Sequence, residues 1–137
     1  MKKTMPRKQG KLTTNNVVME PHEYATINVL LSHRENVELV RKSRTPHTKS
    51  PDIAMCGMFW EIKSPTGRTL RPIERIIHRA IKQSQNVIID LRRTKLADKI
   101  TLKFLQQLFY ELRSMRNLWI ITKKTDIVKM KKISIAI

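Results

Sequence analysis

The sequence predicts a single α/β domain: a mixed β-sheet flanked by helices, with elements in the order α-β-β-β-α-β-α-β. Three observations lead to this class. The chain has 137 residues, enough for one compact core. Three long segments carry apolar residues at helical spacing, and short apolar runs of strand length lie around them. Hydrophobic residues make up 40% of the sequence, which is typical of a folded chain.

The first helix is expected to begin at Pro21 and to run to about His33, because proline is favoured in the first helical turn. Ile27 and Leu30 fall on one stripe of this helix. Glu23 occupies the same stripe, at the i, i+4, i+7 spacing. A carboxylate on an otherwise apolar face is unusual, so Glu23 is a candidate functional residue.

Two further helices are expected over about 70–85 and 98–115. The second helix buries an apolar side made of Ile73, Ile76, Ile77, Ala80 and Ile81. The third and longest helix buries Phe104, Leu105, Leu108, Phe109 and Leu112.

The strands are predicted from alternation and from short apolar runs. Residues 37–42 alternate, and residues 44–51 have the composition of a loop. Two short runs around Cys56-Gly57 indicate a β-hairpin over 52–63. Residues 87–91 and 118–121 are continuous apolar runs, which is typical of strands covered on both faces.

The charge balance points to polyanionic partners. Lys and Arg number 28 against 11 Asp and Glu, so the formal net charge is +17. Such a field attracts RNA or DNA first, an acidic protein second and an anionic membrane third. No apolar run approaches the ~18 residues of a membrane span, and no secretory signal follows the basic start, so a soluble protein is expected. A single cysteine, Cys56, excludes an internal disulfide and a cysteine-based zinc site.

We divide the chain into a basic N-terminal arm over 1–20, a domain over 21–122 and a basic C-terminal extension over 123–137. The arm either lies along phosphates or only increases solubility. Residues after Thr122 alternate basic and apolar side chains, and their structure is not predicted.

The hairpin carries the candidate chemistry. If Cys56-Gly57 is a two-residue turn, Asp52 lies opposite Glu61 on one face, and Lys63, two residues further, shares that face. Opposed carboxylates repel, and a divalent cation offsets the repulsion. Oxygen ligands favour Mg²⁺ or Mn²⁺, with Zn²⁺ as an alternative.

In this interpretation Asp52 and Glu61 are metal ligands, and Glu23 is a further carboxylate for the same metal. Lys63 would orient or deprotonate a water, or neutralise charge in the transition state. The alternative is a surface ion pair between Glu61 and Lys63, with Asp52 capping a turn.

Basic residues follow the proposed metal strand and the next strand. A stripe on the second helix and an adjacent basic pair would hold phosphates without reading sequence. The candidate residues are Arg71, Arg75, Arg79, Lys82, Arg92 and Arg93. A solvated helix face is the alternative for the helical stripe.

The motifs Pro51-Asp52 and Glu61-Ile62-Lys63 resemble the signature of the PD-(D/E)xK nuclease superfamily. Together with residues 22–26, 49–52, 60–67 and 83–95 they look like the C-terminal toxin domains of contact-dependent growth inhibition exoproteins. This resemblance covers about 21–122. It implies a PD-(D/E)xK-like sheet, a tRNA-cleaving and commonly metal-dependent nuclease, delivery into neighbouring bacteria and a cognate immunity protein.

The resemblance assigns Glu23 as the helix carboxylate, Asp52 and Glu61 as metal ligands and Lys63 as the catalytic lysine. The sequence therefore predicts a metal-dependent nuclease that acts on RNA, with tRNA as the favoured substrate. The alternatives are a DNA endonuclease of the same fold and a non-catalytic nucleic-acid-binding protein. An acidic immunity partner is expected from charge, and no membrane partner. A toxin domain would act in the target-cell cytoplasm, and a stand-alone relative in its own.

Overall fold

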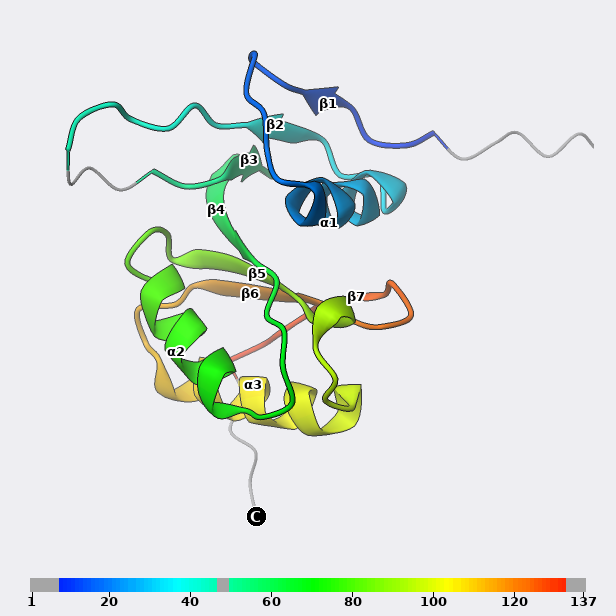
Figure 1. The fold of residues 1–137 in the computed structure, drawn as a ribbon, viewed down its shortest axis with the longest axis vertical. Coiled ribbons are helices and arrows are strands. Elements are labelled where there is room, and N and C mark those ends of the chain that lie inside the picture. The colour runs from blue at the N-terminus through cyan, green and yellow to red at the C-terminus, as the bar shows by residue number, and fades with distance from the viewer. Residues whose placement is uncertain (1–7, 47–49, 133–137) are drawn as a thin grey trace, which may run out of the picture.

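The computed structural model describes residues 8–46 and 50–132. Its elements follow the predicted order, with one short strand added at each end (Figure 1). They are β1 (Leu12–Thr13), α1 (Pro21–Ser32), β2 (Val37–Leu39), β3 (Ile53–Met55), β4 (Met58–Lys63), α2 (Arg71–Ala80), β5 (Asn86–Asp90), the short 3-10 helix η1 (Leu91–Arg93), α3 (Asp98–Glu111), β6 (Asn117–Ile121) and β7 (Ile127–Lys129).

The strands form one seven-stranded mixed sheet in the spatial order β1-β2-β3-β4-β5-β6-β7. β2, β3 and β4 pair antiparallel, β4, β5 and β6 pair parallel, and β7 returns antiparallel to β6. β1 pairs parallel to β2 at the other edge. The mixed sheet predicted from the sequence is therefore confirmed.

The sheet divides at β4. The first half of this strand, Met58–Trp60, pairs with β3, whereas its second half, Glu61–Lys63, pairs with β5. One strand thus belongs to two half-sheets in succession, and Figure 1 shows β4 descending from the β1–β3 half to the β5–β7 half. The candidate acidic residue Glu61 stands at the change of partner.

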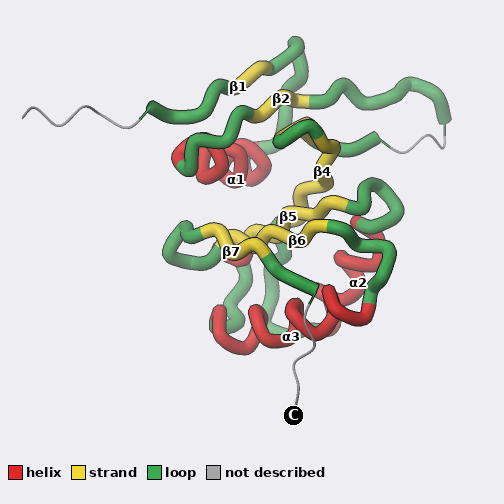
Figure 2. Tube along the Cα trace, turned by 180° about the vertical axis from the view of Figure 1, so that it is seen from behind, coloured by secondary structure: helices red, strands yellow, loops and turns green. Residues whose placement is uncertain are grey.

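The two faces of the sheet have different helical covers (Figure 2). α1 packs on the face that carries Trp60, Ile62 and Ile88, and the rings of Trp60 and Trp119 lie 4.8 Å apart in this core. α2 and α3 pack on the opposite face against Val87, Ile89 and other residues of β5 and β6. β5 is therefore covered on both sides, as its continuous apolar run predicts.

The hairpin register is as predicted: Met55 pairs with Met58 across Cys56-Gly57. Both turn residues have positive φ, 56° at Cys56 and 72° at Gly57. This combination is typical of a type I′ turn. Such turns are favoured in hairpins because their twist matches that of the flanking strands. The turn fixes which residues of β3 and β4 face each other near the candidate site.

The predicted segments are longer than the observed ones. β2 ends at Leu39 rather than at residue 42, and α2 ends at Ala80 rather than near residue 85. After α2 the backbone tightens into turns, because Lys82 N–H donates to Arg79 O and Gln83 N–H donates to Ala80 O, both three residues back. These residues form the connection to β5.

Residues at both ends extend the sheet. Within the segment assigned to the basic arm, Gly10 N–H donates to Leu31 O at 2.8 Å, and β1 follows. A Cβ at position 10 would collide with the backbone of Glu35, so glycine permits this close approach. Residues 1–7 of the arm and 133–137 of the extension lie outside the described residues. Among the described residues, no helix is long and apolar enough to span a membrane.

Candidate active site

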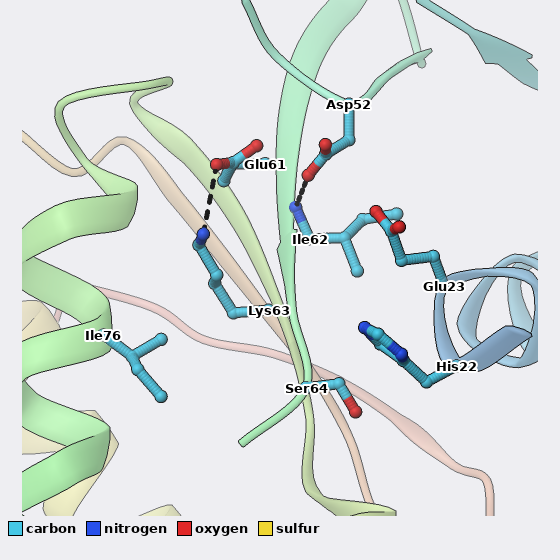
Figure 3. A pocket seen from close by; sticks show the side chains of 8 residues that line it. All are labelled: His22, Glu23, Asp52, Glu61, Ile62, Lys63, Ser64 and Ile76. Atoms are coloured by element: carbon cyan, nitrogen blue, oxygen red, sulfur yellow. Dashed lines mark hydrogen bonds and ion pairs between the residues drawn. The ribbon is translucent and has the colours of Figure 1, made fainter. Parts of the chain in front are cut away.

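The second half of β4 borders a pocket of about 340 Å³ between α1 and α2. In Figure 3, α1 approaches β4 from one side and α2 from the other. The lining residues are His22, Glu23, Asp52, Glu61, Ile62, Lys63, Ser64 and Ile76. All four residues predicted to be catalytic therefore border one pocket.

Asp52 forms hydrogen bonds with the backbone of the residues directly before and after Glu61. Its backbone N–H donates to Trp60 O at 3.0 Å, and its Oδ2 accepts the Ile62 N–H at 2.8 Å. The ladder itself ends one residue earlier, at the pair of Ile53 with Trp60. The ladder pair expected between Asp52 and Glu61 is thus replaced by these two bonds, because the Asp52 carboxylate takes the Ile62 N–H at the strand edge.

Lys42 holds Asp52 in this position. Its Nζ donates to Asp52 Oδ1 at 2.7 Å, to Ser50 O at 3.0 Å and to Pro51 O at 3.1 Å. Burial opposes ionisation of Asp52. The contact with Glu61 and the bonds from Lys42 and Ile62 outweigh burial, so the pKa of Asp52 is lowered. Sequence reasoning missed Lys42, since no spacing rule relates it to Asp52.

Glu61 is almost fully buried, with 4% of its surface exposed. Its Oε2 lies 3.4 Å from Lys63 Nζ, so the predicted pair is formed. Its Oε1 is buried and has no hydrogen-bond partner among the described residues. Burial and the neighbouring Asp52 raise the pKa of Glu61 to about 8, although Lys63 partly offsets them.

Glu23 reaches the pocket from the first turn of α1 (Figure 3). Its Oε1 also accepts the Glu20 N–H at 3.1 Å and completes a capping box with Glu20. In the described part of the chain, no three His, Cys, Asp or Glu side chains are grouped so that they could hold a metal. The role of Glu23 as a further metal ligand stays a prediction.

Asp90 ties α1 to the end of β5. It is 2% exposed, and its Oδ2 accepts the Thr26 hydroxyl at 2.7 Å. Arg92 donates to both carboxylate oxygens through Nε, and to Oδ2 through its terminal nitrogen at 2.8 Å. Thr26 lies one turn beyond Glu23, so this cluster fixes the helix that reaches the pocket. The acid at the end of an apolar run was a sequence signal for Asp90, but its partner Thr26 was not predictable.

The predicted phosphate contacts differ in their surroundings. Arg71, Arg75, Arg79, Lys82 and Arg93 are exposed. Arg93 also donates to Ser64 O at 3.4 Å, which places it next to a residue of the pocket wall. Arg92 is instead occupied by Asp90, so its guanidinium serves the structure of this cluster. Asp90 engages Nε and one terminal nitrogen of Arg92, and the predicted role of this side chain in holding phosphate stays a prediction.

The acidic pair suits a divalent cation. Glu61 Oε1 is a buried oxygen without a partner among the described residues, and the Asp52 carboxyl lies close enough to raise the pKa of Glu61. An unbalanced buried charge of this kind is stabilised by a proton or a cation. Two carboxylates supply the oxygen ligands that Mg²⁺ and Mn²⁺ prefer, and substrate oxygens or water would have to complete the shell.

The fold and this pocket define an α/β domain in which an acidic pair and a lysine meet where a mixed sheet divides. The model of the contact-dependent growth inhibition CdiA C-terminal domain matches residues 49–127, more than half of the chain. The chain therefore belongs to this family of CdiA C-terminal toxin domains.

A solved structure supports the same fold. A chain of the CdiA-CT/CdiI toxin and immunity complex from Burkholderia pseudomallei aligns with a TM-score of 0.69. The alignment covers 89% of this chain and 99% of that chain, at 17% sequence identity. None of the curated proteins compared with the sequence matches it.

Proposed function

We propose that this domain is a metal-dependent nuclease of the PD-(D/E)xK type. It cleaves phosphodiester bonds in RNA, and tRNA is the favoured substrate. One observation carries the proposal: buried Glu61, with an oxygen that has no partner among the described residues, lies beside both Asp52 and Lys63 in one pocket. A structural ion pair does not need a second acid at a pocket wall, whereas two carboxylates supply the oxygen ligands with which Mg²⁺ or Mn²⁺ can be held for hydrolysis.

Asp52 and Glu61 would hold the cation, with Mg²⁺ or Mn²⁺ expected and Zn²⁺ as an alternative. When bound, such an ion polarises the phosphoryl group and acidifies water. Lys42 keeps Asp52 ionised and aimed at the strand edge, and the Ile62 N–H fixes its second oxygen. Glu23 is proposed as a further carboxylate that reaches the same site from α1.

Lys63 is placed to act on the phosphate or the nucleophile. Its Nζ is held by Glu61 at 3.4 Å, and its side chain is 34% exposed, so substrate can contact it. Lys63 would orient the attacking water or neutralise the charge that develops on the phosphate oxygens. Figure 3 shows Lys63 and Glu61 on the same side of β4.

The basic exposed side chains would position the nucleic acid over this pocket. Ile76 of α2 lines the pocket, and Arg75 and Arg79 lie within one helical turn of it. Arg93 donates to the carbonyl oxygen of Ser64, which lines another part of the same pocket. Phosphate contacts of this kind provide affinity and register but no sequence preference.

As a toxin domain, this chain would be delivered into neighbouring bacteria and neutralised by an immunity protein. The proposal is supported by its family, and by a fold-related chain that comes from a toxin and immunity complex. An immunity protein for this chain is expected to be acidic, because the net charge here is +17.

The first experiment incubates the protein with labelled tRNA or duplex DNA, with Mg²⁺ or Mn²⁺ and with EDTA. RNA cleavage that EDTA abolishes is expected. Cleavage of DNA alone would favour the DNA endonuclease, and binding without cleavage that survives Asp52→Ala would favour a non-catalytic binding protein.

Variants of the pocket sharpen this test. Glu61→Gln removes the charge but keeps the shape, so cleavage should fall to background while RNA binding persists. Lys63→Ala should lower kcat by about 100-fold or more. The matched control is Glu111→Gln on the exposed end of α3, which should cleave like the wild type. Cleavage by Glu61→Gln at the control rate would refute the proposed site.

A further inference from the structure

Phe59 is an exposed aromatic residue beside the candidate site. Its surface is 57% exposed, and among the described residues it is the only large apolar side chain of a strand that is exposed. It precedes Glu61 by two residues on β4, and strand alternation places both on the same face. The separation along the strand is about 7 Å. A single nucleotide can span this distance.

The face that carries Phe59 is open. Met58, Trp60 and Ile62 pack into the core beneath α1, so Phe59 and Glu61 project to the opposite side. On that side, the described core beneath α2 and α3 contains residues of β5 and β6 but none of β3 or β4. The cross-strand neighbour of Phe59 is the small Ala54, followed by Glu38 on β2. A flat ligand can therefore lie on the Phe59 ring.

The backbone beneath Phe59 is firmly held. Its carbonyl oxygen accepts the Ser84 hydroxyl at 2.7 Å and the Asn86 side-chain amide at 2.9 Å. The tight turn at Cys56-Gly57 ends directly before this strand begins. A ring on such a backbone loses little freedom when a ligand binds, which favours stacking.

We propose that Phe59 is a stacking platform for an unpaired nucleobase next to the cleaved phosphodiester. This inference rests on the proposed nuclease function and deepens it: the substrate is single-stranded or looped RNA, not a continuous duplex. Proteins that bind unpaired nucleic acid combine basic grooves with aromatic rings on which bases stack. In this arrangement the acidic pair would hold the cation, and Lys63 and the arginines of α2 would contact the phosphates. Phe59 would stack on the adjacent base.

The test measures binding with EDTA present, so that cleavage plays no part. The probes are a fluorescein-labelled single-stranded RNA of mixed sequence, the same RNA annealed into a full duplex, and single strands with one abasic position. Phe59→Ala should bind the single strand about 5- to 100-fold more weakly and the duplex unchanged. Phe59→Trp should restore affinity, and its fluorescence should be quenched by the intact strand but not by the strand abasic at the stacked position.

Tyr110→Ala is the matched control, since Tyr110 is an exposed aromatic residue on α3, with 45% of its surface exposed. It should bind both RNAs like the wild type. An equal loss of affinity for the single strand and the duplex would overturn the proposal. No loss of affinity in Phe59→Ala would also overturn it and would favour a protein partner as the ligand of the exposed ring.

The two proposals fail in different ways. If the wild type cleaves nothing but Phe59→Ala weakens single-strand binding, the nuclease function is wrong and the stacking platform stands. If the wild type cleaves RNA and Phe59→Ala binds and cleaves equally well, only the stacking platform is wrong.

Discussion

At the scale of single residues, the described part of the chain buries three side-chain carboxylates in different ways. Asp52 has Lys42, Asp90 has Arg92, and Glu61 has the more distant Lys63. The pKa values of Asp52 and Asp90 are lowered, whereas that of Glu61 is raised. A pocket with adjacent acids of opposite shift is a candidate for catalysis, because their environments separate their roles.

Asp90 gives a stability prediction that does not depend on the nuclease proposal. Burial opposes its ionisation, but bonds from Arg92 and Thr26 outweigh burial, so its pKa is lowered in the folded protein. Its contribution is therefore complete above the ordinary Asp pKa of about 3.9 and is lost as the pH falls through the folded value. Asp90→Asn should lower the free energy of unfolding by about 2 kcal/mol at neutral pH.

The measurement is urea unfolding of both proteins from pH 7 down to pH 3. The difference between wild type and Asp90→Asn should shrink below about pH 4. Asp126→Asn, at an exposed turn, is the control and should follow the wild type throughout. A difference that stays constant over this range would mean that the Asp90 charge does not stabilise the fold.

Residue identity was more predictable than residue geometry. The spacing of Asp52, Glu61 and Lys63 placed them near one another, and they do line one pocket. The bond from Asp52 to the Ile62 N–H and the anchor at Lys42 were not predictable, because both depend on how the chain after β2 returns to the sheet. Arg92 resembled a phosphate contact in sequence, and only folding brings it against Asp90.

At the scale of elements, the hairpin β3–β4 sets the alignment of the acidic pair. Gly57 has φ of 72°, and a Cβ added at this position would meet no atom within 4 Å, so only backbone conformation restricts the residue type. Gly57→Ala should therefore cost about 1 kcal/mol of folding free energy. Equilibrium unfolding in urea measures this cost.

Gly57→Asn is the comparison, since asparagine tolerates positive φ better than alanine does. It should be destabilised less than Gly57→Ala. Equal stability of both variants and the wild type would show that the turn does not require its left-handed geometry in solution.

Elements with strong periodicity were predicted well from the sequence. The first helix, the hairpin and the strands over β5 and β6 appear where expected, because each has a clear apolar pattern or turn signal. β1 and β7 carry no such pattern: β1 has two residues and β7 alternates weakly. Both gain their structure by pairing with a sheet edge, which is information from tertiary structure.

At the scale of the whole molecule, a net charge of +17 should make nucleic-acid binding strongly dependent on salt. Each phosphate contact releases counterions, so affinity falls linearly with salt on logarithmic axes. Arg75→Ala combined with Arg79→Ala should reduce that slope by about 2 and weaken binding more than the chemical step. RNA binding in EDTA, measured over a salt series, tests the slope, and single-turnover cleavage tests the chemistry.

The control replaces Lys99 and Lys103, two exposed lysines of α3, by alanine. This double variant removes the same charge from another surface. If it reduces the salt slope as much as the arginine variant does, the general field of the protein, rather than a track along α2, accounts for the binding.

The division of the sheet at β4 has a mechanical consequence. Asp52 directly precedes β3, which belongs to the half-sheet of β1–β3, while the segment of β4 with Glu61 pairs with β5 of the other half-sheet. An ion held between these two acids would link the halves across the seam. The core beneath α1 already joins the two halves, so occupancy by the ion should raise the melting temperature of the whole sheet, because the ion binds only the folded arrangement.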